Sequence, residues 1–81
     1  MKLPRDISSE DLIFALKRLG YSPTRQAGSH IRLTTLVGGE HHVSVPRHAN
    51  LSIGVIGSIL RDVGEHARLD RVELYELLFR N

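Results

Sequence analysis

The sequence predicts an α+β fold: a two-layer sandwich of two helices on three antiparallel strands, followed by an additional C-terminal helix. Three observations predict it. Apolar residues recur with helical spacing near the N-terminus and again after residue 52. Two stretches between residues 30 and 45 alternate apolar and polar side chains, as half-buried strands do, and two glycines separate them. With 81 residues, the chain is expected to form a single domain over 1–81, with a core at about 8–64 and the last helix at about 70–80.

The first helix is expected over Ser9–Leu19. Ser8 and Asp11 have the spacing of a capping box, in which each side chain accepts from the other residue's backbone. Gly20 follows the last apolar residue, where a glycine commonly ends a helix. The buried stripe comprises Leu12, Ile13, Leu16 and Leu19.

Three strands are expected next, over Tyr21–Gln26, His30–Leu36 and His41–Val45. Pro23 lacks a backbone donor, so the first of them is expected at the edge of the sheet. A three-residue loop at 37–39, with Gly39 left-handed, pairs Leu33 with Val43 and keeps one face apolar. That register places four side chains on the face away from the core, namely His30, Arg32, His42 and Ser44.

The second helix is expected to begin after Ser52 and to end at Gly64. Gly54 and Gly57 are costly inside a helix, so they mark either close packing on the sheet or a backbone kept bare near a ligand. The third helix is expected over Asp70–Arg80, with Asp70 and Glu73 at capping spacing. Its leucines either complete the core, which we favour, or form a partner surface.

Composition excludes several classes of function. The chain has no cysteine, so disulfides, thiolate metal sites and cysteine nucleophiles are excluded, and a reducing, cytoplasmic setting is expected. Neither a signal peptide nor a membrane-spanning run is visible. Aromatic residues make up only 5%, which argues against a base-stacking surface. Residues 1–35 hold six basic and three acidic residues, so an anionic partner is expected to bind that half.

Gly28-Ser29-His30 is the strongest candidate for chemistry. A glycine and a small serine leave backbone open to a phosphate, and a histidine transfers protons near neutral pH. Arg32, on the same strand face, is a candidate phosphate clamp, and so is Arg25. A second acid/base is either His42 or His48, or is absent.

The remaining histidines are not expected to take part in chemistry, and for His42 too an ordinary exposed strand residue is the favoured interpretation. His41 is expected to be an ordinary exposed strand residue, and His66 a residue of a solvated loop. A metal site is not expected, because neighbouring strand histidines point to opposite faces and no acid supports them.

Four short segments resemble the HicA toxin family, the ribonuclease half of a toxin–antitoxin pair. They are Leu19-Gly20-Tyr21, Arg25-Gln26-Ala27-Gly28-Ser29-His30, Val45-Pro46-Arg47-His48, and residues 54–64, which are similar to the family's glycine-bounded helix. The resemblance implies a fold like the double-stranded-RNA-binding domain and cleavage of mRNA without metal or cofactor.

The resemblance also assigns residues and partners. His30 is the implied catalytic residue, and the implied partners are mRNA and a HicB-type antitoxin that covers the active surface. The residues expected to contact RNA phosphate are Arg25, Gly28, Ser29, Arg32, Arg47 and His48. Two other classes stay open: a non-catalytic RNA-binding module and a protein-interaction module.

Overall fold

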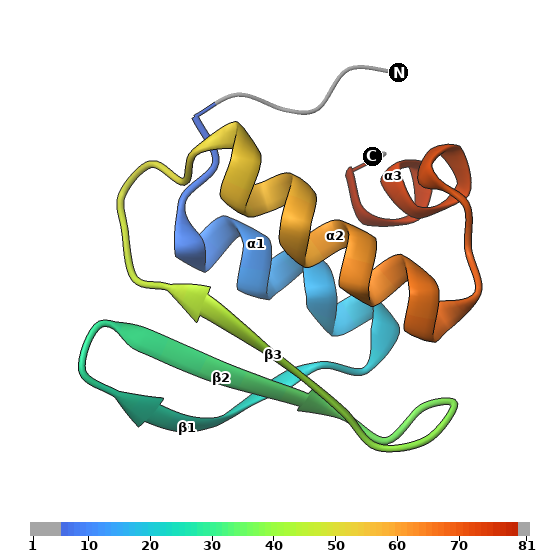
Figure 1. The fold of residues 1–81 in the computed structure, drawn as a ribbon, viewed down its shortest axis with the longest axis horizontal. Helices are drawn as coiled ribbons and strands as arrows, with labels where there is room; N and C mark the ends of the chain where they lie inside the picture. Colours follow the sequence, from blue (N-terminus) through green and yellow to red (C-terminus); the bar gives the residue numbers. More distant parts are fainter. Residues whose placement is uncertain (1–5, 80–81) are drawn as a thin grey trace.

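The computed structural model describes residues 6–79 and confirms the predicted fold class (Figure 1). A helix and three antiparallel strands are followed by two helices. In chain order the elements are α1 (Ser9–Leu16), the short 3-10 helix η1 (Lys17–Leu19), β1 (Ser22–Ala27), β2 (His30–Thr35), β3 (His41–Pro46), α2 (Ile53–Ala67) and α3 (Arg71–Phe79).

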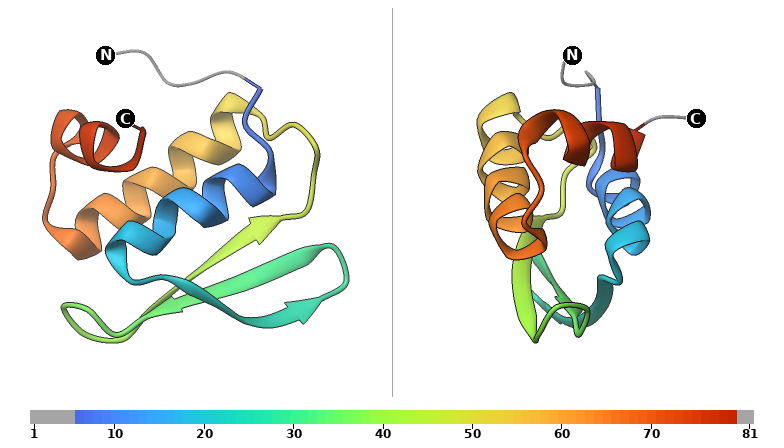
Figure 2. Two further views of the ribbon diagram at one scale, coloured as in Figure 1. Left: turned by 180° about the vertical axis from the view of Figure 1, so that it is seen from behind. Right: turned by 90° about the vertical axis from the view of Figure 1, so that its right-hand side faces the viewer.

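The elements form layers that leave one face of the sheet uncovered. The strands lie in the order β1-β2-β3, and α1 and α2 lie side by side on one face (Figures 1 and 2). α3 crosses these helices on the side away from the sheet, as the right-hand view of Figure 2 shows. Among the described residues, no helix is long and apolar enough to cross a membrane.

The first helix begins and ends as its sequence predicts. The Ser8 hydroxyl accepts from the Asp11 N–H at 3.0 Å, and the Asp11 carboxylate accepts from the Ser8 N–H at 3.1 Å. Gly20 then reverses the chain with a left-handed backbone, φ 85°. The helix tightens to 3-10 geometry over its last turn. The left-handed Gly20 then turns the chain toward β1, which begins two residues later.

The hairpin register is also confirmed. Leu33 pairs with Val43, and Arg32 pairs with Ser44. The loop is longer than predicted, because the last pair is Thr35 with His41 and residues 36–40 lie outside the ladder. Leu36, expected in the strand, is 75% exposed. The alternation of apolar and polar residues therefore predicted the register correctly, but it did not predict where the strands end.

A β-bulge in β1 was not predicted. Pro23 pairs with Leu33, and Arg25 already pairs with Arg32, so Thr24 is an extra residue on the β1 side. A bulge lets neighbouring residues face the same side of a sheet. Here it keeps Arg25 on the outer face although an additional residue precedes it.

The core lies between the sheet and the helices. It takes large side chains from α1, α2 and α3 and from β2 and β3, whereas β1 contributes none of its six residues. Its fully buried members include Leu12, Leu16, Tyr21, Leu33, Val45, Ile56, Leu60, Val63 and Leu74. β1 is therefore the exposed edge of the sheet, as Pro23 predicts.

The predicted end of α2 at Gly64 is wrong. The helix continues to Ala67, and Arg68 adopts the left-handed conformation, φ 59°. A β-carbon on Gly64 would lie 3.2 Å from the Leu69 carbonyl oxygen, so this glycine allows a close approach inside the helix. The prediction that Gly54 and Gly57 allow close packing on the sheet is also wrong, since nothing lies within 4 Å of the position that a β-carbon would take at either residue.

The last helix completes the core. Asp70 and Glu73 form the predicted reciprocal cap, with contacts of 2.8 and 3.1 Å. Leu74, Tyr75 and Leu78 are buried, whereas Val72 and Leu77 are exposed. At the other end, Arg18 of η1 donates to the Leu77 carbonyl at 2.7 Å. The described helix ends at Phe79, and Arg80, the predicted end, lies outside the described residues.

Candidate functional site

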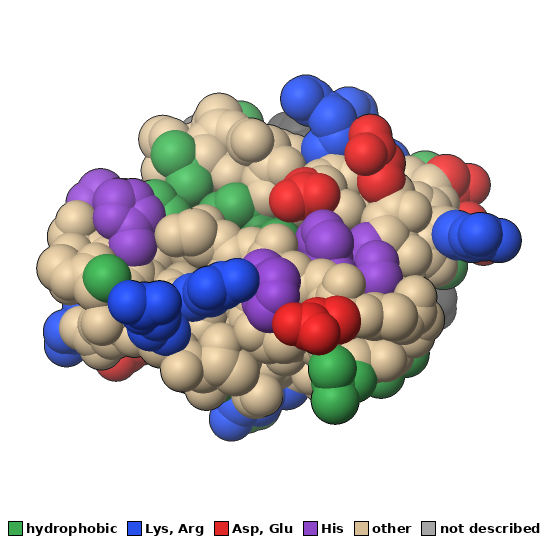
Figure 3. All heavy atoms as spheres, turned by 60° about the horizontal axis from the view of Figure 1, so that its bottom comes forward, with side chains coloured by type: hydrophobic (Ala, Val, Ile, Leu, Met, Phe, Trp, Pro, Cys, Tyr) green, Lys and Arg blue, Asp and Glu red, His purple; other side chains and the backbone are tan. Residues whose placement is uncertain are grey.

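The uncovered face of the sheet carries a shallow hollow of about 370 Å³. Figure 3 is turned to bring this side forward and shows arginine or lysine and histidine side chains gathered across it. The hollow is lined by Arg25, Ala27, His30, Arg32, His42, Val43 and Ser44. The four residues that the register was expected to place on the outer face therefore line one hollow, and Arg25 joins them.

His30 is the first residue of β2 and directly follows the Gly28-Ser29 turn. Its side chain is exposed, and its Nδ1 lies 3.5 Å from the Ser29 hydroxyl, at the outer limit of a hydrogen bond. Nε2 has no hydrogen-bond partner among residues 6–79. This nitrogen is therefore accessible to a molecule in the hollow.

The turn before His30 is held from the opposite strand and is open to solvent. The Arg47 N–H donates to the Ser29 carbonyl at 2.7 Å. Gly28 has φ 58°, and nothing lies within 4 Å of the position a β-carbon would take. The glycine is needed for the left-handed turn, and the space beside it is wide enough for a ligand to approach the backbone.

Arg25 and Arg32 lie directly opposite each other across β1 and β2. Both are exposed, and neither forms an ion pair among the described residues. Like charges at opposed strand positions repel each other, so an anion between them would relieve that repulsion. This pair places two positive charges in the lining of the hollow, which contains no acidic residue.

Arg47 and His48 do not join this group. They line a second hollow of about 390 Å³, whose other residues are Ser8, Ser9, Glu10, Gln26, Ile31 and Ala49. The His48 carbonyl accepts from the Ser9 N–H at 3.0 Å and from its hydroxyl at 3.2 Å. Of the six candidate phosphate contacts, Arg25 and Arg32 thus line the first hollow and Arg47 and His48 line the second. Gly28 and Ser29, in the turn before His30, line neither.

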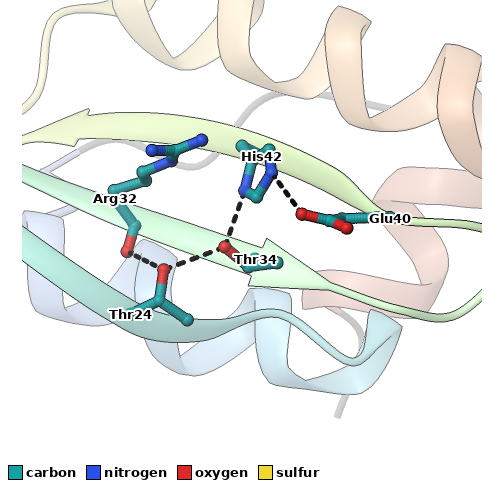
Figure 4. A network of polar contacts seen from close by, with 5 residues as sticks. All are labelled: Thr24, Arg32, Thr34, Glu40 and His42. Carbon is teal, nitrogen blue, oxygen red and sulfur yellow. Dashed lines mark hydrogen bonds and ion pairs between the residues drawn. The ribbon is translucent and has the colours of Figure 1, made fainter.

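His42 is held at both ring nitrogens (Figure 4). Nδ1 lies 2.7 Å from the Thr34 hydroxyl, and Nε2 lies 2.9 Å from a Glu40 carboxylate oxygen. Sequence reasoning singled out neither Thr34 nor Glu40, nor Thr24, whose hydroxyl lies 2.8 Å from that of Thr34. The predicted register, which pairs Thr34 with His42, was the signal that could have found the first of them.

The expectations for His41 and His66 are wrong. The His41 ring bridges the Tyr21 hydroxyl at 2.7 Å and the Asp62 carboxylate at 3.2 Å. His66 lies in α2, stacks on His41 with ring centroids 4.4 Å apart, and bonds the Val37 carbonyl at 2.9 Å. These two residues tie the hairpin loop to α2, so both have a structural role that the sequence analysis did not predict.

Tyr21 is the buried member of that cluster. Burial, and after it the negative charge of Asp62, raise the pKa of its hydroxyl to about 12. The phenol is therefore a hydrogen-bond donor to His41 and not a nucleophile. Within residues 6–79, no three histidine or carboxylate side chains converge on a position that could hold a metal ion.

Comparison with known proteins identifies the family. A family model described as the HicA toxin of bacterial toxin–antitoxin systems matches residues 9–65, from the start of α1 almost to the end of α2. Searches of curated proteins and of solved structures gave no match. The matched segment holds the first hollow, the second hollow except Ser8, and most of the core, and α3 lies beyond it. On this match, the chain belongs to the HicA family of toxins from toxin–antitoxin systems.

Proposed function

We propose that this HicA-family protein is a metal-independent endoribonuclease that cleaves mRNA, with His30 as its catalytic residue. The observation that carries the proposal is the position of His30. Its exposed imidazole lies in one hollow with the unpaired guanidinium groups of Arg25 and Arg32. A proton-transferring group beside an unsatisfied pair of cations is what a phosphodiester substrate requires.

The cleavage uses the RNA's own 2′-hydroxyl as nucleophile. Its oxygen forms a bond to phosphorus while the bond from phosphorus to the 5′-oxygen breaks, which leaves a 2′,3′-cyclic phosphate and a 5′-hydroxyl. One proton leaves the 2′-oxygen, and one arrives at the 5′-oxygen. His30 performs one of these transfers, and Arg25 and Arg32 stabilise the charge that develops on the phosphate oxygens.

The second hollow suits the same substrate. Arg47 and His48 are both exposed and line the hollow on the other side of the sheet edge from His30. An RNA chain that crosses the Gly28-Ser29 turn would meet cationic side chains in both hollows. We therefore assign Arg47 and His48 to binding of flanking phosphate and not to the chemical step.

The proposed protein partner is a HicB-type antitoxin, because toxins of this family act in toxin–antitoxin pairs. The uncovered sheet face is the surface that such a partner must block, since it presents His30 and the arginine pair together. The substrate assigns the activity to the cytoplasm, where mRNA is translated.

The decisive experiment incubates the purified protein with labelled RNA in EDTA. We expect cleavage by the unaltered protein, with products that end in 2′,3′-cyclic phosphate, and loss of cleavage for His30→Ala. His48→Ala is the matched control. It should weaken RNA binding and leave the rate of cleavage of bound RNA unchanged. Intact RNA that is bound equally by the unaltered protein and by His30→Ala would instead indicate a non-catalytic RNA-binding module.

A further inference from the structure

Four side chains form a row of hydrogen bonds across all three strands of the outer face (Figure 4). Glu40 contacts His42 of β3 at 2.9 Å, and His42 contacts Thr34 of β2 at 2.7 Å. Thr34 contacts Thr24 of β1 at 2.8 Å, and Thr24 donates to the Arg32 carbonyl at 3.4 Å. The row therefore ends on the backbone of a residue that lines the hollow.

Both ends of the row only accept hydrogen bonds. A carboxylate and a carbonyl have no proton to donate, so His42 donates from Nε2 to Glu40, and Thr24 donates from its hydroxyl. Both nitrogens of His42 are thereby used within the protein. His42 also lies four strand positions from Pro46, the partner of His30, which is about 13 Å along the sheet. It is accordingly part of the row and not a second proton-transfer residue.

The β1 end of the row lies at the bulge in that strand. Thr24 is the extra residue, and the next one, Arg25, is opposed to Arg32. The two guanidinium groups repel each other, and bulged strands are the locally irregular part of a sheet. The Thr24 hydroxyl bonds to Thr34 on β2 and to the Arg32 backbone, so it holds together the two strands that carry the repelling charges.

We propose that Thr34 is a positioning residue whose hydroxyl, through Thr24, keeps Arg25 and Arg32 opposed as one two-armed site for an RNA phosphate. This inference rests on the proposed function. Thr34 is the central member of the row, since it alone contacts both neighbouring strands through its side chain. Without its hydroxyl, the bulged strand would hold the Arg25 side chain less firmly opposite Arg32, and Arg32 would bind phosphate with less help from Arg25.

The test measures binding of a short single-stranded RNA by protein carrying His30→Ala, so that the RNA stays intact. Thr34→Val keeps the shape and strand propensity of the side chain and removes the hydroxyl. We expect its dissociation constant to rise about tenfold. We also expect the slope of log affinity against log salt to fall by about 0.7, the value for one lost phosphate contact. Thr34→Ser restores the hydroxyl and should restore both quantities.

A double-variant cycle with Arg25→Gln separates positioning from general loosening of the fold. If Thr34 acts through Arg25, Thr34→Val should cause almost no further loss of RNA affinity in protein that already carries Arg25→Gln. Additive losses, or an unchanged salt slope in Thr34→Val, would overturn the inference. A His30→Ala protein that binds no RNA at all, together with unaltered protein that cleaves none, would instead refute the proposed function on which it rests.

Discussion

Replacing Gly20 with alanine is expected to be among the most damaging small changes to this fold. Gly20 has φ 85°, and a β-carbon there would lie 2.7 Å from the Thr35 hydroxyl oxygen and 2.7 Å from a methyl carbon of Val37. Val37 is 65% exposed and can move, but Thr35 is 1% exposed. The Thr35 hydroxyl also donates to the Leu19 carbonyl at 2.9 Å and accepts from the Val37 N–H at 3.1 Å.

The magnitude follows from two separate costs. A left-handed backbone costs an L-residue about 1–2 kcal/mol, and forcing an extra carbon into a packed site costs about 1–3 kcal/mol. Gly20→Ala should therefore lower the free energy of unfolding by about 2–5 kcal/mol. Gly28→Ala is the matched control, because Gly28 also has a positive φ, 58°, but has nothing within 4 Å. Gly28→Ala should lower the free energy of unfolding by only about 1–2 kcal/mol.

Urea unfolding of the two variants, followed by circular dichroism, measures both losses. The difference between them isolates the clash at Thr35, since backbone strain and the change in the unfolded chain are common to both. Equal losses would refute the reasoning, because they would mean that the space beside Gly20 is not closed by Thr35.

Three further predictions concern the site, the buried tyrosine and the last helix. His30→Ala should lower RNA cleavage by about 10²–10⁴-fold while its melting temperature stays within a few degrees, as measured by gel assay and thermal scan. The free energy of unfolding should fall by roughly 2 kcal/mol as pH rises from 10 to 12, because the unfolded chain releases the Tyr21 proton first. Asp70→Ala removes the acceptor for the Glu73 N–H and should cost about 1 kcal/mol in urea unfolding.

Each of these has its own control. A large drop in the melting temperature of His30→Ala would make His30 structural. Tyr21→Phe cannot ionise, so the alkaline loss should be smaller in that variant, and an identical loss would show that other groups cause it. Glu10→Ala changes an exposed acid in the first turn of α1 that makes no cap contact among the described residues, so it should cost less than Asp70→Ala.

The outer face could be predicted from the sequence because it follows from local alternation. Once Leu33 is paired with Val43 to keep the inner face apolar, Arg32 and His42 have to face outward with His30. The prediction needed no knowledge of how helices pack. The same alternation could not reveal the bulge at Thr24, because a bulge adds one residue to one strand only and the pairing partner lies elsewhere in the chain.

The structural histidines could not be predicted for a different reason. His41 and Tyr21 are 20 residues apart, and His66 and Val37 are 29 apart. Tyr21, which precedes β1, reaches His41 of β3 only after the three strands have paired. His66 reaches Val37 only because α2 lies across the end of the hairpin, and the angle of a helix on a sheet is set by the packing of the whole core. Gly64 misled the prediction similarly, since a glycine that ends a helix and one that admits a neighbour have the same sequence signal.

The residues that stabilise this small fold are separate from the residues of the candidate site. Every fully buried side chain lies between the sheet and the helices or among the helices, whereas Arg25, His30 and Arg32 are exposed on the other face. Opposed arginines are unfavourable in the free protein, and the core, which does not involve them, compensates for that cost. Neutral substitutions such as Arg25→Gln or Arg32→Gln should consequently leave the fold as stable as before or slightly more stable, while RNA binding falls.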